Sequence, residues 1–237
     1  MNSLMMQPKA VLLDIEGTTT PKDFVYRKLF PFAKEHLNEF LDAHSEDVEV
    51  QKCLSKIIGN YSQVSPHDKN TGRKEITDLI ISLIDSDSKF TAFKELEAMI
   101  WNSGYASGEL KGEVYPDVPP AIKRWHDSGI VVSIYSSGSV PAQKAIFSTT
   151  QYGDLTRYIF SYFDTNVGPK NEPDSYERIS GLIGVDPSRI VFVSDSVIEL
   201  QAADASGFMT YLSVRPGMEN PPNGKYRVIR NFSELRF

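Results

Sequence analysis

Short, unbroken apolar runs that end in small polar or acidic residues constrain the fold of this chain more than any other feature of its sequence. Continuous apolar residues, rather than alternating ones, are typical of strands buried on both faces of a parallel sheet. With helical patterns between them, the runs predict a doubly wound α/β sheet, in which ligands bind at the carboxyl ends of the strands. The expected strands are residues 10–14, 130–135, 158–160, 189–193 and 208–212, and the expected helices are residues 119–128, 140–148, 174–183 and 199–205.

A long segment between the first and second strands has a different pattern. Its apolar residues recur at a spacing of 3.6 residues in 24–41, 76–84 and 90–100, with little strand signal. We therefore predict a helical cap of residues 21–112, inserted into an α/β core domain of residues 1–20 and 113–237. Because the insertion follows the first strand, we expect the cap to lie over the carboxyl end of the sheet. We interpret the charges at Lys94, Glu95 and Glu97 as a solvated helix face.

Composition limits the classes of function that need to be considered. The chain has 237 residues, 41% of them hydrophobic, and a net charge of −6, which disfavours binding to nucleic acid or to an anionic membrane. A single cysteine, Cys53, excludes an intrachain disulfide framework and a zinc site built from cysteines. No apolar run is long enough to cross a bilayer, and the amino terminus has no secretory signal pattern. We expect a cytoplasmic monomer.

Two carboxylates follow the first predicted strand. Asp14 ends the strand and Glu16 lies two residues further on, before a sharp exit at Gly17. Both carboxylates can face one crevice, so that one acts as a nucleophile and the other as a general acid and base. An isolated aspartate after a strand is more often a helix N-cap. The catalytic interpretation therefore depends on what the other strand ends carry.

The next strand ends carry groups suited to a phosphate. Ser136 and Ser137 begin a glycine-containing turn before a helix, where hydroxyls and backbone N–H groups can hold an anion. Lys170 lies in a Gly/Pro turn before another helix, where a lysine can offset the charge of a phosphoryl group and of an aspartate nucleophile.

An acidic corner is expected at the fourth predicted strand. Asp195 follows this strand and Glu199 lies one helical turn later. Oxygen-rich corners with one or two carboxylates suit Mg²⁺, which keeps several of its waters. All of these groups follow strands of one parallel sheet, so we expect them to converge on one crevice.

The order of these motifs resembles the haloacid dehalogenase superfamily of aspartyl-phosphate phosphatases, over nearly the whole chain. More narrowly, the stretch Leu-Asp-Ile-Glu-Gly-Thr-Thr-Thr-Pro at 13–21, with Ser-Ser-Gly-Ser at 136–139, resembles the enolase-phosphatase branch, of which Glu16 in place of a second aspartate is a mark. The loop 215–220 reads Arg-Pro-Gly-Met-Glu-Asn and departs from the Arg-Pro-Gly-Asn form expected for that branch.

The resemblance implies roles for individual residues. It assigns one Mg²⁺ per subunit to Asp14, Glu16 and Asp195, with Glu199 beside the metal site rather than on the ion. It assigns substrate contacts to Ser136, Ser137 and Lys170, and catalysis to Asp14, Glu16 and Lys170. The backbone carbonyl of Glu16 can reach the metal and leave its side chain for proton transfer. The family resemblance extends the expected localisation from the cytoplasm to the nucleus.

The implied reaction belongs to methionine salvage. A small phosphorylated diketone, 2,3-diketo-5-methylthiopentyl-1-phosphate, is enolised and then dephosphorylated through an aspartyl-phosphate to the acireductone 1,2-dihydroxy-5-methylthiopent-1-en-3-one. Mg²⁺ serves both steps by polarising a carbonyl and by offsetting phosphoryl charge. The base for enolisation is not identified, and a cap residue or Glu16 remains open.

Other functions are compatible with parts of the pattern. One alternative is a general sugar-phosphate phosphatase on the same fold. A dehalogenase is disfavoured because a halide leaving group needs no proton, which makes Glu16 unnecessary. A signalling domain phosphorylated on Asp14 is disfavoured by the chain order of the acidic residues and the lysine. A catalytically silent scaffold is disfavoured because every charged group that the mechanism needs is present.

Overall fold

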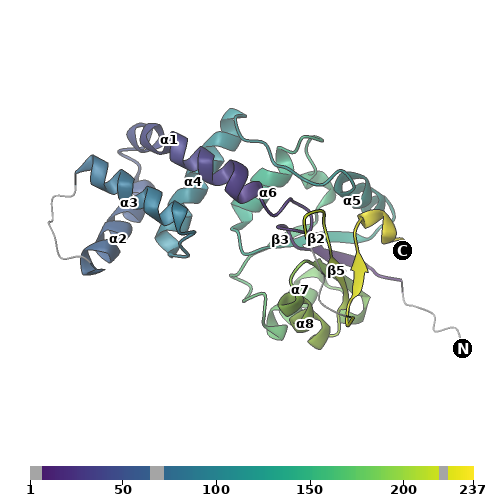
Figure 1. The fold of residues 1–237 in the computed structure, drawn as a ribbon. Helices are drawn as coiled ribbons and strands as arrows, with labels where there is room; N and C mark the ends of the chain where they lie inside the picture. The colour runs from purple at the N-terminus through teal and green to yellow at the C-terminus, as the bar shows by residue number, and fades with distance from the viewer. Residues whose placement is uncertain (1–6, 65–71, 219–223) are drawn as a thin grey trace, which may run out of the picture. The chain divides into compact units, whose positions relative to one another are not determined.

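A computed structural model describes residues 7–64, 72–218 and 224–237. The chain divides into two compact units (Figure 1), one formed by the chain up to Lys22 together with residues 111–237, and one formed by residues 23–110. In the described residues no helix has both the length and the apolar character needed to span a membrane.

The first unit is built on a six-stranded parallel sheet with the strand order β3-β2-β1-β4-β5-β6. Leu13 at the end of β1 lies opposite Ile134 of β2 and Val193 of β4, so these three strands end level with one another. Strand order reverses at β1, where ligands bind in doubly wound sheets. The strands are β1 Ala10–Leu13, β2 Val131–Tyr135, β3 Ser161–Phe163, β4 Ile190–Ser194, β5 Met209–Ser213 and β6 Arg227–Ile229.

Helices cover both faces of this sheet and confirm the predicted α/β class. Successive residues of a strand point to opposite faces, so Val11 and Leu13 join one buried cluster and Ala10 and Leu12 the other. The first cluster includes residues of α5 (Val118–Asp127) and α6 (Val140–Ser148), and the second includes residues of α7 (Pro173–Ile183) and α8 (Val197–Ala205). Short 3₁₀ helices, η2 Thr156–Tyr158, η3 Pro187–Arg189 and η4 Phe232–Glu234, complete this unit.

The second unit is helical, as the 3.6-residue spacing predicts. A π-helical turn, η1 Val25–Leu29, leads into α1 Phe30–Ala43, and α2 Val48–Val64, α3 Arg73–Asp85 and α4 Thr91–Ser107 follow. These helices bury a core of their own, in which Leu37, Phe93 and Leu96 have no exposed surface. The indole N–H of Trp101 donates to the carbonyl of Leu29 at 2.9 Å and ties α4 to η1.

Three details differ from the sequence-based expectations. The third strand is Ser161–Phe163 rather than residues 158–160, because Tyr158 closes the 3₁₀ turn η2 and Phe160 points to solvent with 62% of its surface exposed. The strand β6 was not predicted. Glu97 does not lie on a solvated face: it is 1% exposed, and Lys94 donates to it from the preceding turn of α4. Burial raises the pKa of Glu97, and Lys94 opposes this effect.

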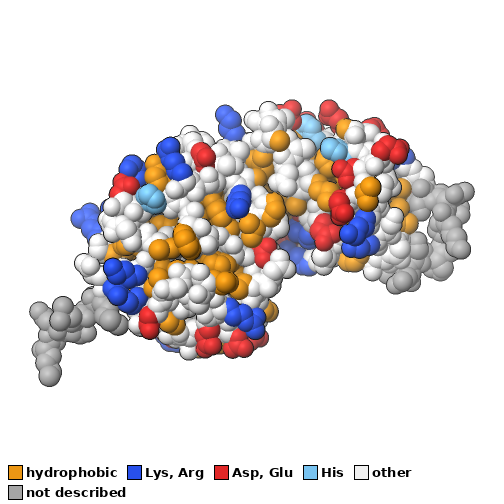
Figure 2. All heavy atoms as spheres, turned by 180° about the vertical axis from the view of Figure 1, so that it is seen from behind, with side chains coloured by type: hydrophobic (Ala, Val, Ile, Leu, Met, Phe, Trp, Pro, Cys, Tyr) orange, Lys and Arg blue, Asp and Glu red, His pale blue; other side chains and the backbone are white. Residues whose placement is uncertain are grey.

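Charged side chains of both signs are interspersed on the face drawn in Figure 2, with hydrophobic side chains among them. That face therefore presents no extended basic surface to a polyanion.

Candidate active site

Asp14 lies at the carboxyl end of β1, where two backbone contacts hold it. Its N–H donates to the carbonyl of Val193 on β4 at 3.0 Å, and its own carbonyl accepts from the hydroxyl of Thr19 at 3.0 Å. The residue is only 6% exposed. These contacts place a buried carboxylate at the point where strand order reverses, as the sequence predicts for a nucleophile.

Lys170 contacts Asp14 directly, across 156 positions of sequence. Its Nζ lies 2.5 Å from Oδ1 of Asp14 and 2.8 Å from Oε2 of Glu199. Ser194 at the end of β4 donates to the same Glu199 oxygen at 2.9 Å. The Lys170 ammonium group, on a side chain that is 10% exposed, therefore lies between the Asp14 carboxylate at the end of β1 and the Glu199 carboxylate at the start of α8.

The turn that carries Lys170 is fixed by its neighbours. The hydroxyl of Tyr176 in α7 donates to the carbonyl of Lys170 at 2.7 Å, and the hydroxyl of Ser175 donates to Pro169 at 2.7 Å. Tyr135 at the end of β2 donates to the carbonyl of Gly168 at 2.9 Å. Gly168 has a φ of +145°, and a Cβ there would collide with Ser175. The lysine is thus presented from a rigid turn.

Burial and charge shift the protonation of these groups. The pKa of Asp14 is raised to about 7, chiefly by burial and in part by the neighbouring carboxylates of Glu199 and Asp195, while Lys170 opposes the rise. For Lys170, burial disfavours the charged form, but the carboxylates of Asp14 and Glu199 outweigh burial and raise its pKa above its ordinary value. The lysine therefore carries a positive charge at neutral pH, next to a carboxyl group that is easily protonated unless more positive charge is present.

Asp195 lies beside the turn that follows Asp14. Its Oδ2 accepts from Nζ of Lys22 at 3.0 Å, and its side chain is 10% exposed. Gly17 has a φ of +70°, and a Cβ at this position would collide with the Asp195 carboxylate. Glu16, one residue before Gly17, is exposed at the same turn. The three acidic residues that the resemblance assigns to a metal thus belong to one small region.

Ser136 and Ser137 follow β2 but differ in their surroundings. Ser136 is 9% exposed and its hydroxyl accepts from the N–H of Gly138 at 3.2 Å, whereas Ser137 is exposed. The start of α6 was expected to be open to an anion. Instead Asp164, which follows β3, accepts from the N–H of Val140 at 3.3 Å. An anion at this turn therefore has the serines and the other backbone N–H groups of the turn as its donors.

The donor set fits Mg²⁺. Asp14 and Asp195 supply two carboxylates, and Mg²⁺ takes one or two carboxylates together with waters and phosphate oxygens. Burial, and after it the carboxylates of Glu199 and Asp195, raise the pKa of Asp14, and a divalent cation bound there would favour its ionised form. Across the described residues no group of three or more His, Cys, Asp or Glu side chains is arranged to hold a metal ion, so the fit to Mg²⁺ depends on the two aspartates alone.

Several neighbours of the site were not predicted from sequence. Lys22, the contact between Glu199 and Lys170, and Asp164 were each missed. A usable signal existed for Asp164, because it directly follows β3 as Asp14 and Asp195 directly follow β1 and β4. Arg215 begins the unusual loop 215–220 and is buried, with a hydrogen bond to the turn after β1. Residues 219 and 220 of that loop lie outside the described residues.

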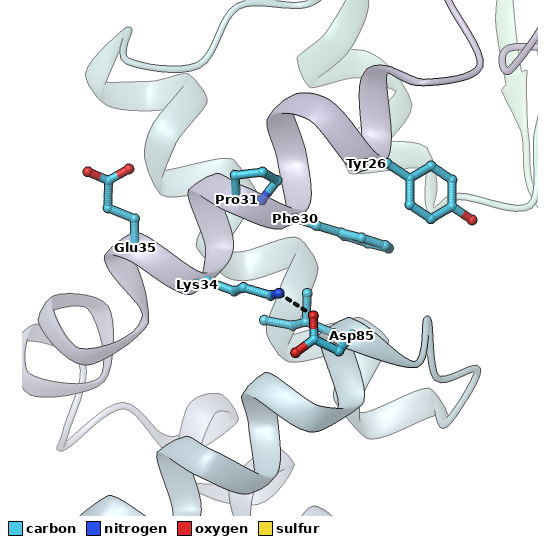
Figure 3. A pocket seen from close by; sticks show the side chains of 7 residues that line it. Tyr26, Phe30, Pro31, Lys34, Glu35 and Asp85 are labelled. Atoms are coloured by element: carbon cyan, nitrogen blue, oxygen red, sulfur yellow. Dashed lines mark hydrogen bonds and ion pairs between the residues drawn. The ribbon is translucent and has the colours of Figure 1, made fainter.

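A separate hollow of about 600 Å³ lies in the helical unit, lined by residues of η1, α1 and α3. The rings of Tyr26 and Phe30 flank it, and Lys34 pairs with Asp85 at its edge (Figure 3). None of the acidic residues at the strand ends lines this hollow.

Comparisons with known proteins show the family of the chain. Residues 8–207 match the haloacid dehalogenase-like hydrolases. The chain is 44% identical to enolase-phosphatase E1 of Synechococcus elongatus over 95% of this chain and 96% of that protein. It is 42% identical to enolase-phosphatase E1 of Aquifex aeolicus over 96% and 98%, respectively.

Solved structures share the fold of the chain. The crystal structure of the UTR4 protein of Saccharomyces cerevisiae superposes with a TM-score of 0.79 at 37% identity, covering 97% of this chain and all of that one. A dehalogenase crystal structure at 22% identity, with a TM-score of 0.55, shares the fold. The chain belongs to the haloacid dehalogenase-like hydrolases and, within them, to the enolase-phosphatase E1 family of phosphatases.

Proposed function

We propose that this chain is a Mg²⁺-dependent enolase-phosphatase of methionine salvage. It converts 2,3-diketo-5-methylthiopentyl-1-phosphate to 1,2-dihydroxy-5-methylthiopent-1-en-3-one and phosphate. The observation that carries the proposal is the buried pair of Asp14 and Lys170 at the strand-order reversal. The near full-length likeness to enolase-phosphatases E1 supports the choice of substrate. The proposed enzyme binds one Mg²⁺ per chain and acts as a cytoplasmic monomer.

Asp14 is the proposed nucleophile of the phosphatase step. Its carboxylate forms a bond to phosphorus while the bond from phosphorus to the substrate oxygen breaks. Lys170 contacts Oδ1 of Asp14 and lies where it offsets the negative charge of the transferring group. Glu199 and Ser194 hold the lysine in this place. Ser136 and Ser137 are the proposed donors to the substrate phosphate.

Glu16 is the proposed proton carrier. It donates a proton to the leaving enol oxygen as the phosphorus–oxygen bond breaks, and then removes a proton from the water that hydrolyses the aspartyl-phosphate. The carboxylates of Asp14 and Asp195, with the backbone carbonyl of Glu16, are the proposed ligands of Mg²⁺. When bound, Mg²⁺ supplies carbonyl polarisation for enolisation and charge neutralisation for phosphoryl transfer.

The helical segment 21–112 is the proposed cap domain, inserted in sequence into a core of residues 1–20 and 113–237. An insertion between the first strand and the second is attached to the chain next to Glu16 and Lys22, which lie on the turn after β1. The cap is therefore the part of the chain that we propose to select the methylthio end of the substrate.

Removal of divalent metal is the experiment that tests the proposed function. We expect EDTA to stop phosphate release from the diketo phosphate and added Mg²⁺ to restore it, because the carboxylates of Asp14 and Asp195 are the proposed ligands of the ion. Phosphate is measured against a panel that includes simple sugar phosphates. Turnover that persists without metal excludes the proposed role of Asp195. Faster hydrolysis of sugar phosphates than of the diketo phosphate favours a general phosphatase.

A further inference from the structure

Arg215 is a buried arginine outside the proposed catalytic set. It lies two residues after β5 and only 4% of its surface is exposed. Its guanidinium lies between two aromatic rings, 4.4 Å from the ring centroid of Tyr115 and 4.5 Å from that of Phe232. Burying a guanidinium is costly unless its donors are paired. Among the described residues Nε and Nη1 are paired, Nη1 donating also to the carbonyl of Arg230 at 3.2 Å, whereas Nη2 has no partner, so the partners of Nε and Nη1 indicate what the residue holds.

The partners of Arg215 join the turn after β1 to the rest of the α/β unit. Nε donates to the carbonyl of Thr18 at 2.8 Å, and Nη1 donates to Oδ2 of Asp117 at 2.8 Å. The same Asp117 oxygen accepts from the N–H of Phe232 at 2.7 Å. Asp117 thus anchors the arginine, and the arginine in turn holds Thr18.

Thr18 belongs to the turn that carries Glu16. The N–H groups of Thr18, Thr19 and Thr20 all donate to the carbonyl of Ile15, at 2.9 to 3.2 Å. The carbonyls of Gly17 and Thr18 accept hydrogen bonds from residues at and after the end of β5. The hydroxyl of Ser213, the last residue of β5, donates to Gly17 at 3.1 Å, next to the contact from Arg215 to Thr18. Two consecutive carbonyls of the turn are therefore held from the end of β5.

We propose that Arg215, assisted by Ser213, is a positioning residue that fixes this turn so that Glu16 meets the leaving-group oxygen. The inference rests on the proposed role of Glu16 in proton transfer. A lysine cannot replace the arginine, because one ammonium group cannot donate to Thr18 and Asp117 from a planar fork while stacking between two rings. Arg215 touches no reacting atom and acts only through the turn.

Leaving-group dependence separates this role from a general structural one. Phenyl phosphate and p-nitrophenyl phosphate have nearly the same shape, but only the first needs a proton on its leaving oxygen. We expect Arg215→Lys to lower kcat for phenyl phosphate by roughly tenfold to a hundredfold, with a clearly smaller loss for p-nitrophenyl phosphate and little change in KM. Arg236→Lys is the matched control, because Arg236 is exposed and, within the described part of the chain, its Nε donates to the nearby carbonyl of Ser233.

Equal losses for the two aryl phosphates, or no loss for either, would overturn the proposal. If Arg215→Lys does not fold, as judged by thermal melting, Ser213→Ala decides the matter, since it frees the carbonyl of Gly17 without leaving a buried charge unpaired. Glu16→Gln, assayed alongside, identifies which claim fails. If Glu16→Gln loses more kcat on phenyl phosphate than on p-nitrophenyl phosphate, but the Arg215 and Ser213 variants do not, the positioning proposal is refuted and the proton-transfer role of Glu16 stands. If Glu16→Gln loses the same fraction of kcat on both aryl phosphates, the proton-transfer role of Glu16 is refuted, and the positioning proposal is refuted with it.

Discussion

Asp14→Asn is expected to reduce phosphate release to below about 1% of the wild-type rate, the usual scale of loss when a nucleophile is removed. The amide keeps the shape of the carboxylate but is a poor nucleophile and a weaker ligand for a divalent cation. The measurement is steady-state phosphate release from the diketo phosphate at saturating Mg²⁺.

Folding of the Asp14→Asn variant is the control for this prediction. The two backbone contacts of residue 14, to Val193 and from Thr19, do not involve its side chain. We therefore expect the variant to melt cooperatively and to keep the circular dichroism spectrum of the wild type. A folded variant that retains more than about 1% of the wild-type activity would count against covalent catalysis at this residue.

Lys170→Ala is expected to lower kcat/KM by an amount equivalent to roughly 2 to 4 kcal/mol of transition-state stabilisation. The substitution leaves the carboxylates of Asp14 and Glu199 close together without the ammonium group that lies 2.5 and 2.8 Å from them. Phosphoryl charge then builds up next to Asp14 with one cation fewer.

The exposed Lys144 on α6 offers a matched control for this change. Lys144→Ala removes the same side chain from the same unit without touching either carboxylate, and we expect kcat/KM to stay near the wild-type value. A Lys170→Ala variant with normal kcat/KM would refute the proposed role of Lys170 in offsetting the charge of the transferring phosphoryl group.

Much of the sheet could be predicted because burial on both faces leaves a strong pattern. The runs that became β1, β2, β4 and β5 are four or five residues long and mostly apolar, with Ser133 inside β2 and Thr210 inside β5, and each predicted boundary lies within one residue of the structure. At the sheet edges the pattern weakens. The strand β3 contains Ser161 and starts three residues after the predicted one, and β6 begins with the exposed Arg227, so neither has an unbroken apolar run.

The candidate site could be predicted to the extent that its groups follow strand ends. Asp14, Ser136 and Asp195 lie directly after β1, β2 and β4, and parallel strands bring their ends to one edge. Two contacts were not predictable, the ion pair of Lys170 with Glu199 and the hydrogen bond from Arg215 to the Thr18 carbonyl. Each depends on how long side chains pack after turns, which no spacing in the sequence encodes.

The most direct test of the central proposal, that one site both enolises and dephosphorylates, follows the ultraviolet absorbance of the conjugated enol and free phosphate in the same reaction. With wild-type protein, Mg²⁺ and the diketo phosphate, we expect enol product and phosphate to appear together. With Glu16→Gln we expect phosphate release to fall strongly while enol formation stays measurable, because the backbone carbonyl of residue 16 is retained. Release of phosphate by the wild type without an enol product would contradict the proposal, and so would rapid hydrolysis of sugar phosphates with no reaction of the diketo phosphate.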